Sequence, residues 1–387
     1  MEIRTYQSFE ELQSVAAPWE DLLSSYPLTT TFSTPEWLIP WSRTVGKEQR
    51  LLVLGFFDQP SRLCALAALE ATSMRVGNTA PLNVLRLLGD GTFDSDNLNL
   101  PVRPGFEQEF AATFLNYLDS QRKPWDLCDL RTLPTQSPGV AALLRLLKKN
   151  KWTFAMKPRP AAAIPLPETW DEYLGRLSTE DSKNLTRYLR RLEKRYVVNM
   201  YRCTREEQLP RCLEALFKLH QARWTSAGEP GSFGSQERRD FYYGVSHLLL
   251  PRNLLDIWVL ELDGEIASVQ FAFRHGRTVF QLQEGNDPQH ASDRVGFVLR
   301  GHVIRELIRQ GIRTYDFLGG PLGYKGRWGA EVRNYLDLTF ARPFSLGAAY
   351  IQGHTFAHAG KEWLRRNLPN HAWQTLHNLN LRYKRTA

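Results

Sequence analysis

Short apolar runs of strand length alternate along this chain with longer amphipathic runs of helix length, which predicts a mixed α/β protein. In the first half, Pro35 follows Phe32-Ser-Thr and predicts a helix that opens with this proline. The other elements expected in this half are strands over 51–57 and 63–71, a polar loop over 89–99, a helix over 106–118 and a strand over 126–130.

The second half repeats this order with a stronger pattern. Asp263-Gly264 joins two apolar runs as a two-residue hairpin turn, because glycine tolerates a positive φ. The elements expected here are strands over 254–262, 265–273 and 278–284, a loop over 285–294, a helix over 295–310 closed by Gly311, and a strand over 315–318. Since both halves run strand, polar loop, helix and short strand, we predict a tandem repeat.

Proline clusters predict where the repeats divide. The 387 residues are too many for one ordinary core and suit two domains of roughly 150 to 200 residues. Lys157-Pro-Arg-Pro160 and Pro165-Leu-Pro167 indicate an extended crossover, so we expect an N-terminal lobe over 1–165 and a C-terminal lobe over 166–345. A basic tail over 346–387 follows, with helical stretches around 363–366 and 373–381.

The expected fold class is therefore α/β (α+β mixed), with mixed, mostly antiparallel sheets flanked by helices. Hydrophobic residues make up 42% and charged residues 23% of the chain, which is typical of a globular protein. The start carries Glu2, Glu10 and Glu11 where a signal peptide would need a basic cap, and no apolar run approaches the roughly 20 residues of a membrane span. We expect a cytoplasmic protein without a membrane span.

Composition also narrows the chemistry. The four cysteines form no C-x-x-C pair, and we expect neither a metal nor a disulfide framework. The formal net charge of +8 favours an anionic substrate or carrier.

The segment around residue 295 is the part best suited to bind such a ligand. We expect the strands before and after the helix over 295–310 to part, which leaves the helix N-terminus open to a carrier's phosphates. The donor-binding candidates are Arg294, Val295, Gly296 and Phe297. An ordinary N-terminal helix turn is the alternative reading of this stretch.

Several motifs together carry a family resemblance. They are Leu216-Phe-Lys-Leu-His-Gln-Ala-Arg-Trp224, the segment 228–233, Leu260-Glu-Leu-Asp-Gly-Glu-Ile-Ala267, Gly285-Asn-Asp287 with Gly296, Tyr315-Asp-Phe-Leu-Gly-Gly320, Tyr324-Lys325 and Trp328. Over about 170–345 the chain resembles the CelD-type branch of the GNAT and FemAB-like acyltransferases, and residues 32–41 resemble their F-x-T-P-x-W segment. The resemblance implies two GNAT-like lobes and transfer of an acyl or aminoacyl group from a carrier to an amine or hydroxyl, in several relatives during envelope or exopolysaccharide synthesis.

This sequence departs from the family at two places. Arg294-Val295 stands where relatives commonly have Ser-Pro before the glycine, so donor binding would use a different contact. Pro321-Leu-Gly323 stands where relatives often carry acidic residues, which argues against an acidic role for that loop.

Four residues are the candidates for catalysis. Glu284 ends the third strand of the second half and Asp287 lies in the following loop, and either would accept a proton from the incoming amine, directly or through water. Tyr324 would protonate the leaving group, and Lys325 would bind a phosphate or stabilise negative charge. The structural alternatives are that Asp287 caps its loop, that Glu284 pairs with a basic residue, and that Tyr324 packs under Trp328.

Further residues are candidates for substrate binding. A helix over 183–196 carries leucines on one face and Lys183, Arg187 and Arg190 on the other, which is either a solvated face or a receptor for an anionic carrier. Trp224, with the loop 228–234, would form a lid. Asp316 and Trp328, from the motifs over 315–328, complete this set.

The sequence is compatible with three hypotheses about the function. The leading one is an acyltransferase that uses acyl-CoA, or a related thioester, as co-substrate and acts on a small-molecule or glycan acceptor; acyl carrier protein is another carrier of this kind. The second is a transferase that takes its aminoacyl group from tRNA. The third is a degenerate GNAT scaffold without turnover that binds an anionic partner.

Overall fold

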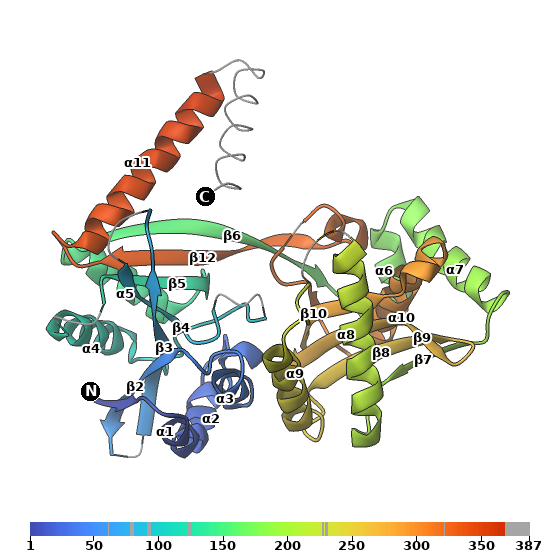
Figure 1. The fold of residues 1–387 in the computed structure, drawn as a ribbon, viewed down its shortest axis with the longest axis horizontal. Helices are drawn as coiled ribbons and strands as arrows, with labels where there is room; N and C mark the ends of the chain where they lie inside the picture. Colours follow the sequence, from blue (N-terminus) through green and yellow to red (C-terminus); the bar gives the residue numbers. More distant parts are fainter. Residues whose placement is uncertain are drawn as a thin grey trace.

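Twelve strands of the described chain form one continuous sheet in the order β1-β2-β3-β4-β5-β12-β6-β11-β10-β9-β8-β7, with helices on its faces (Figure 1). This computed structural model describes residues 1–60, 62–77, 81–90, 94–121, 125–226, 228, 231–320 and 322–367. The strands are β1 (Glu2–Tyr6), β2 (Arg50–Gln59), β3 (Arg62–Met74), β4 (Leu82–Leu87), β5 (Leu127–Pro134), β6 (Thr153–Pro165), β7 (Val198–Arg202), β8 (Leu255–Leu262), β9 (Glu265–His275), β10 (Thr278–Asn286), β11 (Thr314–Asp316) and β12 (Glu331–Ala341).

The helices follow the predicted alternation. They are α1 (Phe9–Ser14), α2 (Ala16–Ser24), α3 (Pro35–Arg43), α4 (Glu107–Ser120), α5 (Pro138–Lys149), α6 (Trp170–Arg176), α7 (Thr179–Glu193), α8 (Leu209–Ser226), α9 (Gln236–Leu249), α10 (Val295–Arg309) and α11 (Leu346–Asn367). Four short 3₁₀ segments are η1 (Thr31–Ser33), η2 (Glu206–Gln208), η3 (Pro288–Asp293) and η4 (Lys325–Trp328). The mixed α/β fold class and the mostly antiparallel pairing are confirmed.

The sheet consists of two similar halves that exchange a strand. Four antiparallel strands and a parallel partner, β1 to β5, match β7 to β11 in order and pairing. The sixth strand of each half then crosses over, because β6 pairs with β11 and β12 pairs with β5. The tandem repeat predicted from the sequence is therefore present in the topology, and the exchange joins the halves into one sheet.

The prolines near residue 160 lie inside β6, where the sequence indicated only an extended crossover. β6 pairs with β12 over residues 153–163, whereas β11 covers its other edge only over residues 163–165. Pro158 and Pro160 therefore lie where one edge of β6 has no partner strand in the described chain. A proline lacks the N–H of a strand residue and is tolerated at such an edge.

Alternating residues of β8 divide the core of the C-terminal half between two faces. Ile257 and Val259 pack with α8 and α9, whereas Trp258 and Leu260 pack with α6, α7 and α10. Successive side chains of a strand point to opposite faces, so a strand buried on both sides reads as one apolar run. The loop that leaves β10 must then reach the start of α10, which covers the second face.

Most predicted element boundaries agree with the structure. The hairpin turn at Asp263 and Gly264 has positive φ at both residues, 53° and 88°. The basic helix begins at Thr179, earlier than predicted, because Ser178 accepts a hydrogen bond from the Asp181 N–H and caps it. The stretch 373–381 lies outside the described residues. Among the residues described, no helix combines the length and apolar character that a bilayer span requires.

Candidate functional site

β10 and β11 run side by side for three residues and then part. Residues 278–280 pair in parallel with residues 314–316. Beyond this point β10 continues against β9, whereas the chain after β11 turns to follow β6 through hydrogen bonds between Ala162 and residues 317–318. The gap expected from the sequence therefore opens between the end of β10 and the segment 317–319.

The start of α10 faces this gap. Arg294 precedes the helix in the left-handed conformation, with φ of 59°, and provides no side-chain cap. The first N–H groups of an α-helix have no acceptor within the helix, so those of Val295 and Gly296 are available to a ligand. The helix dipole adds a partial positive charge at the same end. This terminus is suited to bind an anion.

Asp293 fixes the loop before α10 to the end of α7. Its buried carboxylate pairs with Arg195 and accepts a hydrogen bond from the Tyr196 hydroxyl at 3.3 Å. His290 Nδ1 lies 3.2 Å away and the Arg191 guanidinium 3.8 Å away. The path of the loop is therefore held by charge pairs rather than by apolar packing.

Two glycines allow the close approaches that shape the gap. A Cβ on Gly296 would lie 2.3 Å from Asn286 Oδ1, and this side chain is held at the end of β10 by a 2.7 Å hydrogen bond from the Ser268 hydroxyl. A Cβ on Gly285 would lie 3.0 Å from the backbone nitrogen of His220 in α8. Asn286 therefore occupies the space that a side chain on residue 296 would need, which explains why this position is glycine.

A cavity of about 400 Å³ lies between the end of β10, the start of α10 and η4. Its lining residues are Arg223, Glu284, Asn286, Asp287, Pro288, His290, Ala291, Arg294, Val295, Gly296, Phe297, Arg300, Tyr324, Arg327 and Trp328. Four arginines stand against two carboxylates in this lining, which favours an anionic ligand. Eight predicted residues come together here, namely Glu284, Asp287, Arg294, Val295, Gly296, Phe297, Tyr324 and Trp328.

The buried guanidinium of Arg300 is the main feature that the sequence analysis missed. It pairs with Glu284 and lies over the rings of Phe317, Tyr324 and Trp328, with its Cζ 5.4, 5.6 and 5.4 Å from their centroids. A signal was available, because residue 300 falls on the apolar stripe of α10 at helical spacing from Phe297, Ile304 and Leu307. Arginine on such a stripe indicates a buried partner.

Glu284 and Asp287 show the contacts that the structural alternatives predicted. Glu284 pairs with Arg300, and Arg223 lies 3.7 Å from its other oxygen. Asp287 caps η3 by accepting a 2.8 Å hydrogen bond from the Gln289 N–H. Both carboxylates nevertheless line the cavity, so these contacts place them at its wall.

Tyr324 is half-exposed above Arg300. Burial raises the pKa of its hydroxyl above the usual value of 10, and the nearby Arg300 charge offsets only part of this effect. The hydroxyl therefore keeps its proton at neutral pH and remains a proton donor. Its ring meets Phe317 edge-on, with centroids 6.0 Å apart, whereas Trp328 packs against Phe297 with centroids 4.7 Å apart and the rings tilted by 42°.

Lys325 does not face the cavity as predicted. Its side chain is buried, and Nζ donates to the carbonyl oxygens of residues 317, 318 and 319 at 3.3, 3.0 and 2.5 Å. Burial lowers the pKa of this ammonium. The side chain holds the segment after β11 in place, because the three donors of its ammonium group bind three successive carbonyl oxygens.

Asp316 is also outside the cavity. It is buried at the end of β11, where its carboxylate accepts the Leu318 N–H at 2.7 Å, and burial raises its pKa to about 6. In the adjacent segment, the Gly319 N–H donates to Asp96 Oδ2 at 2.7 Å. The segment 317–319 is therefore fixed by both halves of the molecule.

The basic face of α7 forms a separate hollow of about 750 Å³. Lys183, Arg187 and Arg190 line it together with Leu174, Ser182, Thr186, Arg191, Lys194 and Arg195. Two of these residues, Arg191 and Arg195, also contact Asp293, which directly precedes Arg294 in the chain. The predicted cationic face is present, next to the donor-binding candidates.

The predicted lid is described only in part. Trp224 is exposed on α8, donates to His220 Nε2 at 3.1 Å, and does not line the cavity, whereas its neighbour Arg223 does. The loop 228–234 contains positions 229 and 230, which lie outside the described residues. The lid therefore stays a prediction.

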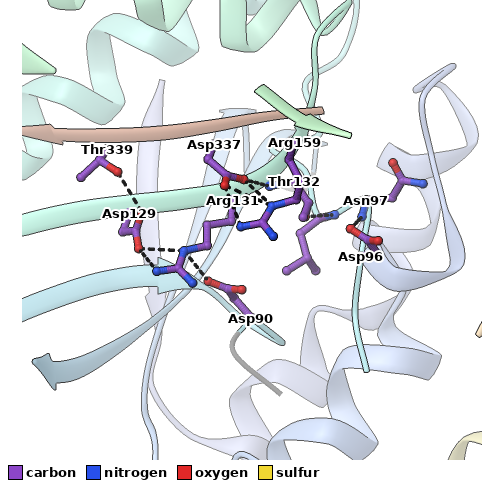
Figure 2. A network of polar contacts seen from close by, with 10 residues as sticks. Asp90, Asp96, Asn97, Asp129, Arg131, Thr132, Arg159, Asp337 and Thr339 are labelled. Carbon is purple, nitrogen blue, oxygen red and sulfur yellow. Dashed lines mark hydrogen bonds and ion pairs between the residues drawn. The ribbon is translucent and has the colours of Figure 1, made fainter. Parts of the chain in front are cut away.

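The equivalent place in the N-terminal half is occupied by ion pairs. Residues 84–86 and 127–129 pair in parallel and then part, as in the other half. Arg131 bridges Asp129 and Asp90, at 2.8 and 3.8 Å, and Arg159 pairs with Asp337 at 2.7 Å (Figure 2). The helix that follows, α4, begins with two glutamates, whereas α10 has no acidic residue in its first turn. Carboxylates at a helix start disfavour a phosphate ligand.

Residues 180–326, which provide all but two of the residues that line the cavity, match the profile of the family described as Acetyltransferase (GNAT) domain. This part of the chain is a GNAT domain. In this domain β10, α10 and β11 form the parted-strand segment, and the arginine-lined cavity lies at its mouth. No curated protein matches the sequence of the chain.

Solved structures extend the likeness to the whole fold. The structure of FemX matches with a TM-score of 0.60 at 11% identity and covers 91% of this chain and 99% of FemX. The structure of L-PGS from Bacillus licheniformis matches with a TM-score of 0.51 at 15% identity and covers 91% and 97% of the two chains. The C-terminal domain of a putative lysylphosphatidylglycerol synthetase from Agrobacterium fabrum matches with a TM-score of 0.52 at 10% identity and covers 89% and 96% of the two chains. At these identities the likeness establishes a FemX-like fold that includes both halves of the sheet.

Proposed function

We propose that this protein is an acyltransferase that moves an acyl group from acyl-CoA, or a related thioester carrier, to an amine or hydroxyl of a small-molecule or glycan-related acceptor. The observation that carries the proposal is the parting of β10 and β11 in front of the α10 N-terminus. The open N–H groups of Val295 and Gly296 and the guanidinium of Arg294 form one wall of a cationic cavity. A carrier's phosphates fit this wall, and its thioester then reaches the gap between the strands.

The cavity also provides groups for the transfer step. The lone pair of the acceptor attacks the thioester carbonyl carbon, the carbon–sulfur bond breaks, and the sulfur leaves as a thiolate. Glu284 or Asp287, directly or through water, takes the proton that the acceptor loses. Tyr324 gives its proton to the thiolate, which suits a hydroxyl that stays protonated at neutral pH.

The neighbouring residues then have positioning roles in this proposal. Arg300 holds Glu284 and supports the ring of Tyr324. Lys325 holds the segment that leads from β11 to Tyr324. In the domain division that we propose, 1–165 provides a structural or acceptor-binding lobe, 166–345 the transferase lobe, and 346–387 a basic tail.

An aminoacyl-tRNA donor is the second candidate, and the basic hollow on α7 favours it. Six Lys and Arg side chains line the hollow, more than the phosphates of a single CoA require. Binding of tRNA through several of these contacts would weaken steeply as salt increases, whereas CoA binding would show a shallower slope.

Thermal-shift measurements with CoA, acetyl-CoA, longer acyl-CoAs, acyl carrier protein and aminoacyl-tRNA test the proposal. A ligand that binds only the native state raises the melting temperature, by the equivalent of about 2.7 kcal/mol at a hundredfold excess over Kd. We expect a shift with CoA thioesters that Arg294→Ser abolishes. Arg305→Ser, on the exposed side of the same helix, is the matched control.

Turnover then separates the enzyme from a scaffold. Release of free thiol from the donor that binds should fall strongly in Tyr324→Phe and in Asp287→Ala, with folding intact. If no carrier raises the melting temperature, or if turnover survives both substitutions, the proposal is wrong. A scaffold would bind its partner without turnover in every variant.

A further inference from the structure

The last described helix, α11, follows β12 and extends as an arm away from the strand ends of β12 and β6 (Figure 1). Ala348 and Ile351 bury its first turns in a small cluster with residues of β4, β5 and β12. From Gln352 to Asn367, every residue whose burial the structure describes is exposed. The outer part of α11 is therefore a helix that the rest of the described chain leaves uncovered.

Such a helix needs a surface to cover it. An isolated helix of this length is marginal in water, and most helical stability in proteins comes from burying an apolar face. Gly353 and Gly360 weaken the helix further, because glycine in a helix interior is unfavourable. The described body of the protein supplies no such contact beyond Ile351.

The exposed part of α11 has two distinct faces. Phe356 and Trp363 are two turns apart on one face, with 77% and 64% of their surfaces exposed. His354 and Arg365 are three turns apart on the opposite face, and both are exposed. At 100° per residue, Phe356 is turned by about 140° around the helix axis from Ile351, the residue that packs on the sheet. The aromatic face is thus directed away from the protein's own core.

The net charge of the chain is concentrated in α11 and in the sequence that follows it, of which residues 368–387 lie outside the described part of the chain. Residues 346–387 contain six basic residues against one acidic residue, Glu362, which gives +5; the basic residues are Lys361, Arg365, Arg366, Arg382, Lys384 and Arg385. The whole chain has 49 against 41, so residues 1–345 have 43 against 40 and contribute only +3. Most of the net charge of +8 therefore belongs to the arm and the residues that follow it.

We propose that α11 is an amphipathic anchor that lays its aromatic face into an anionic phospholipid surface. An aromatic face opposite a polar face, with basic residues in the same segment, is the pattern of helices that lie in the headgroup region. Nucleic-acid sites combine stacking rings with cations in one groove, which does not fit faces on opposite sides of a helix. A second copy would bring two concentrations of positive charge together. The helix lies on the bilayer, and this inference does not depend on the proposed transferase activity.

Sedimentation of the full chain with lipid vesicles tests the anchor. Vesicles of mixed phosphatidylglycerol and phosphatidylcholine should bind the protein at least about tenfold more tightly than vesicles of phosphatidylcholine alone, and 0.5 M salt should weaken this binding. The variant Phe356→Ala/Trp363→Ala should lose about tenfold in affinity, and Arg365→Ser/Arg366→Ser a similar factor. Phe356, Trp363 and Arg365 are exposed, and the melting temperature of each variant is measured beside its binding, which separates a loss of folding from a loss of affinity.

Matched controls are available on the body of the protein. Lys148→Ser/Lys149→Ser removes an adjacent basic pair from the last turn of α5, and Leu248→Ala removes an exposed apolar side chain from α9. Both should bind anionic vesicles as the wild type does. The proposal is overturned by equal binding to neutral and anionic vesicles, by unchanged binding of the arm variants, by tighter binding to an RNA oligonucleotide, or by a dimer that Phe356→Ala/Trp363→Ala dissociates. The assay uses no acyl donor, so its failure would leave the transferase proposal intact.

Discussion

Substituting Gly296 tests how the start of α10 is packed. In Gly296→Ala, the new Cβ would lie 2.3 Å from Asn286 Oδ1 and 2.7 Å from Asn286 Cγ. Either the helix start moves away from β10, or Asn286 swings out and breaks its 2.7 Å bond with Ser268, whose hydroxyl is fully buried. Overpacking of this kind costs about 1–3 kcal/mol, and an unsatisfied buried hydroxyl costs a similar amount. We expect the free energy of unfolding to fall by about 2–3 kcal/mol.

The double variant Asn286→Ala/Gly296→Ala makes the prediction specific. Asn286→Ala alone should cost about 1 kcal/mol for the lost hydrogen bond, and the shorter side chain should then accept the Cβ of residue 296. The double variant should therefore be about 1–2 kcal/mol more stable than the sum of the single variants predicts. Gly175→Ala is the control, because nothing lies within 4 Å of its new Cβ, and helix propensity should raise stability by about 0.5–1 kcal/mol.

Urea denaturation followed by tryptophan fluorescence measures these differences, and amide hydrogen exchange over residues 295–297 shows whether they are local. If Gly296→Ala is as stable as the wild type, or if the two single effects simply add, then Asn286 does not pack against residue 296 and this description of the helix start is wrong.

Three further predictions concern buried charges around the site. Glu284→Gln should lower the free energy of unfolding, measured by urea denaturation, by about 3–5 kcal/mol, because it removes the charge that pairs with the buried guanidinium of Arg300. Arg300→Met should cost less, and equal costs would contradict the pairing. Burial raises the pKa of Asp316 from 3.8 to about 6, so between these pH values the folded state holds a proton that the unfolded state has lost. As pH rises from about 4 to 6, ionisation of this carboxyl should lower the free energy of unfolding by up to about 3 kcal/mol. Asp316→Asn should lack this decline when melting temperature is measured against pH, and the same pH dependence in both proteins would refute the prediction. Lys325→Met removes three bonds to carbonyl oxygens and should speed amide exchange over 317–319 and cost about 3 kcal/mol; unchanged exchange would contradict its holding role.

The fold was predictable where local pattern and tertiary contacts agree. The hairpin at Asp263-Gly264 and the helix that opens with Pro35 both appear as expected, because turn and helix-start chemistry depends on neighbouring residues. The exchange of β6 and β12 was not predictable. The exchange depends on pairing between strands more than 150 residues apart in the sequence. In addition, the prolines of β6 led us to predict an extended crossover where the structure has a strand.

The sequence was sufficient to predict where the site lies in the fold, but not which contacts its side chains make. Glu284, Arg294 and Tyr324 come together because strand, loop and helix order alone determines where the parted strands open. Lys325 was predicted to face a ligand, but its direction depends on three carbonyl oxygens whose orientation a sequence does not reveal. Arg300 could have been recognised by its place on an apolar stripe, although its partner Glu284 depends on how α10 packs on β10.

Backbone amide chemical shifts of Val295 and Gly296 during titration with acetyl-CoA give the most direct test that the α10 N-terminus binds an acyl carrier. We expect these two amides to shift in a saturable way, because a phosphate would accept hydrogen bonds from N–H groups that the helix leaves unused. Saturable binding that leaves both amides unmoved, with shifts confined to α7 or to the N-terminal half, would contradict the assignment of this cavity as the donor site.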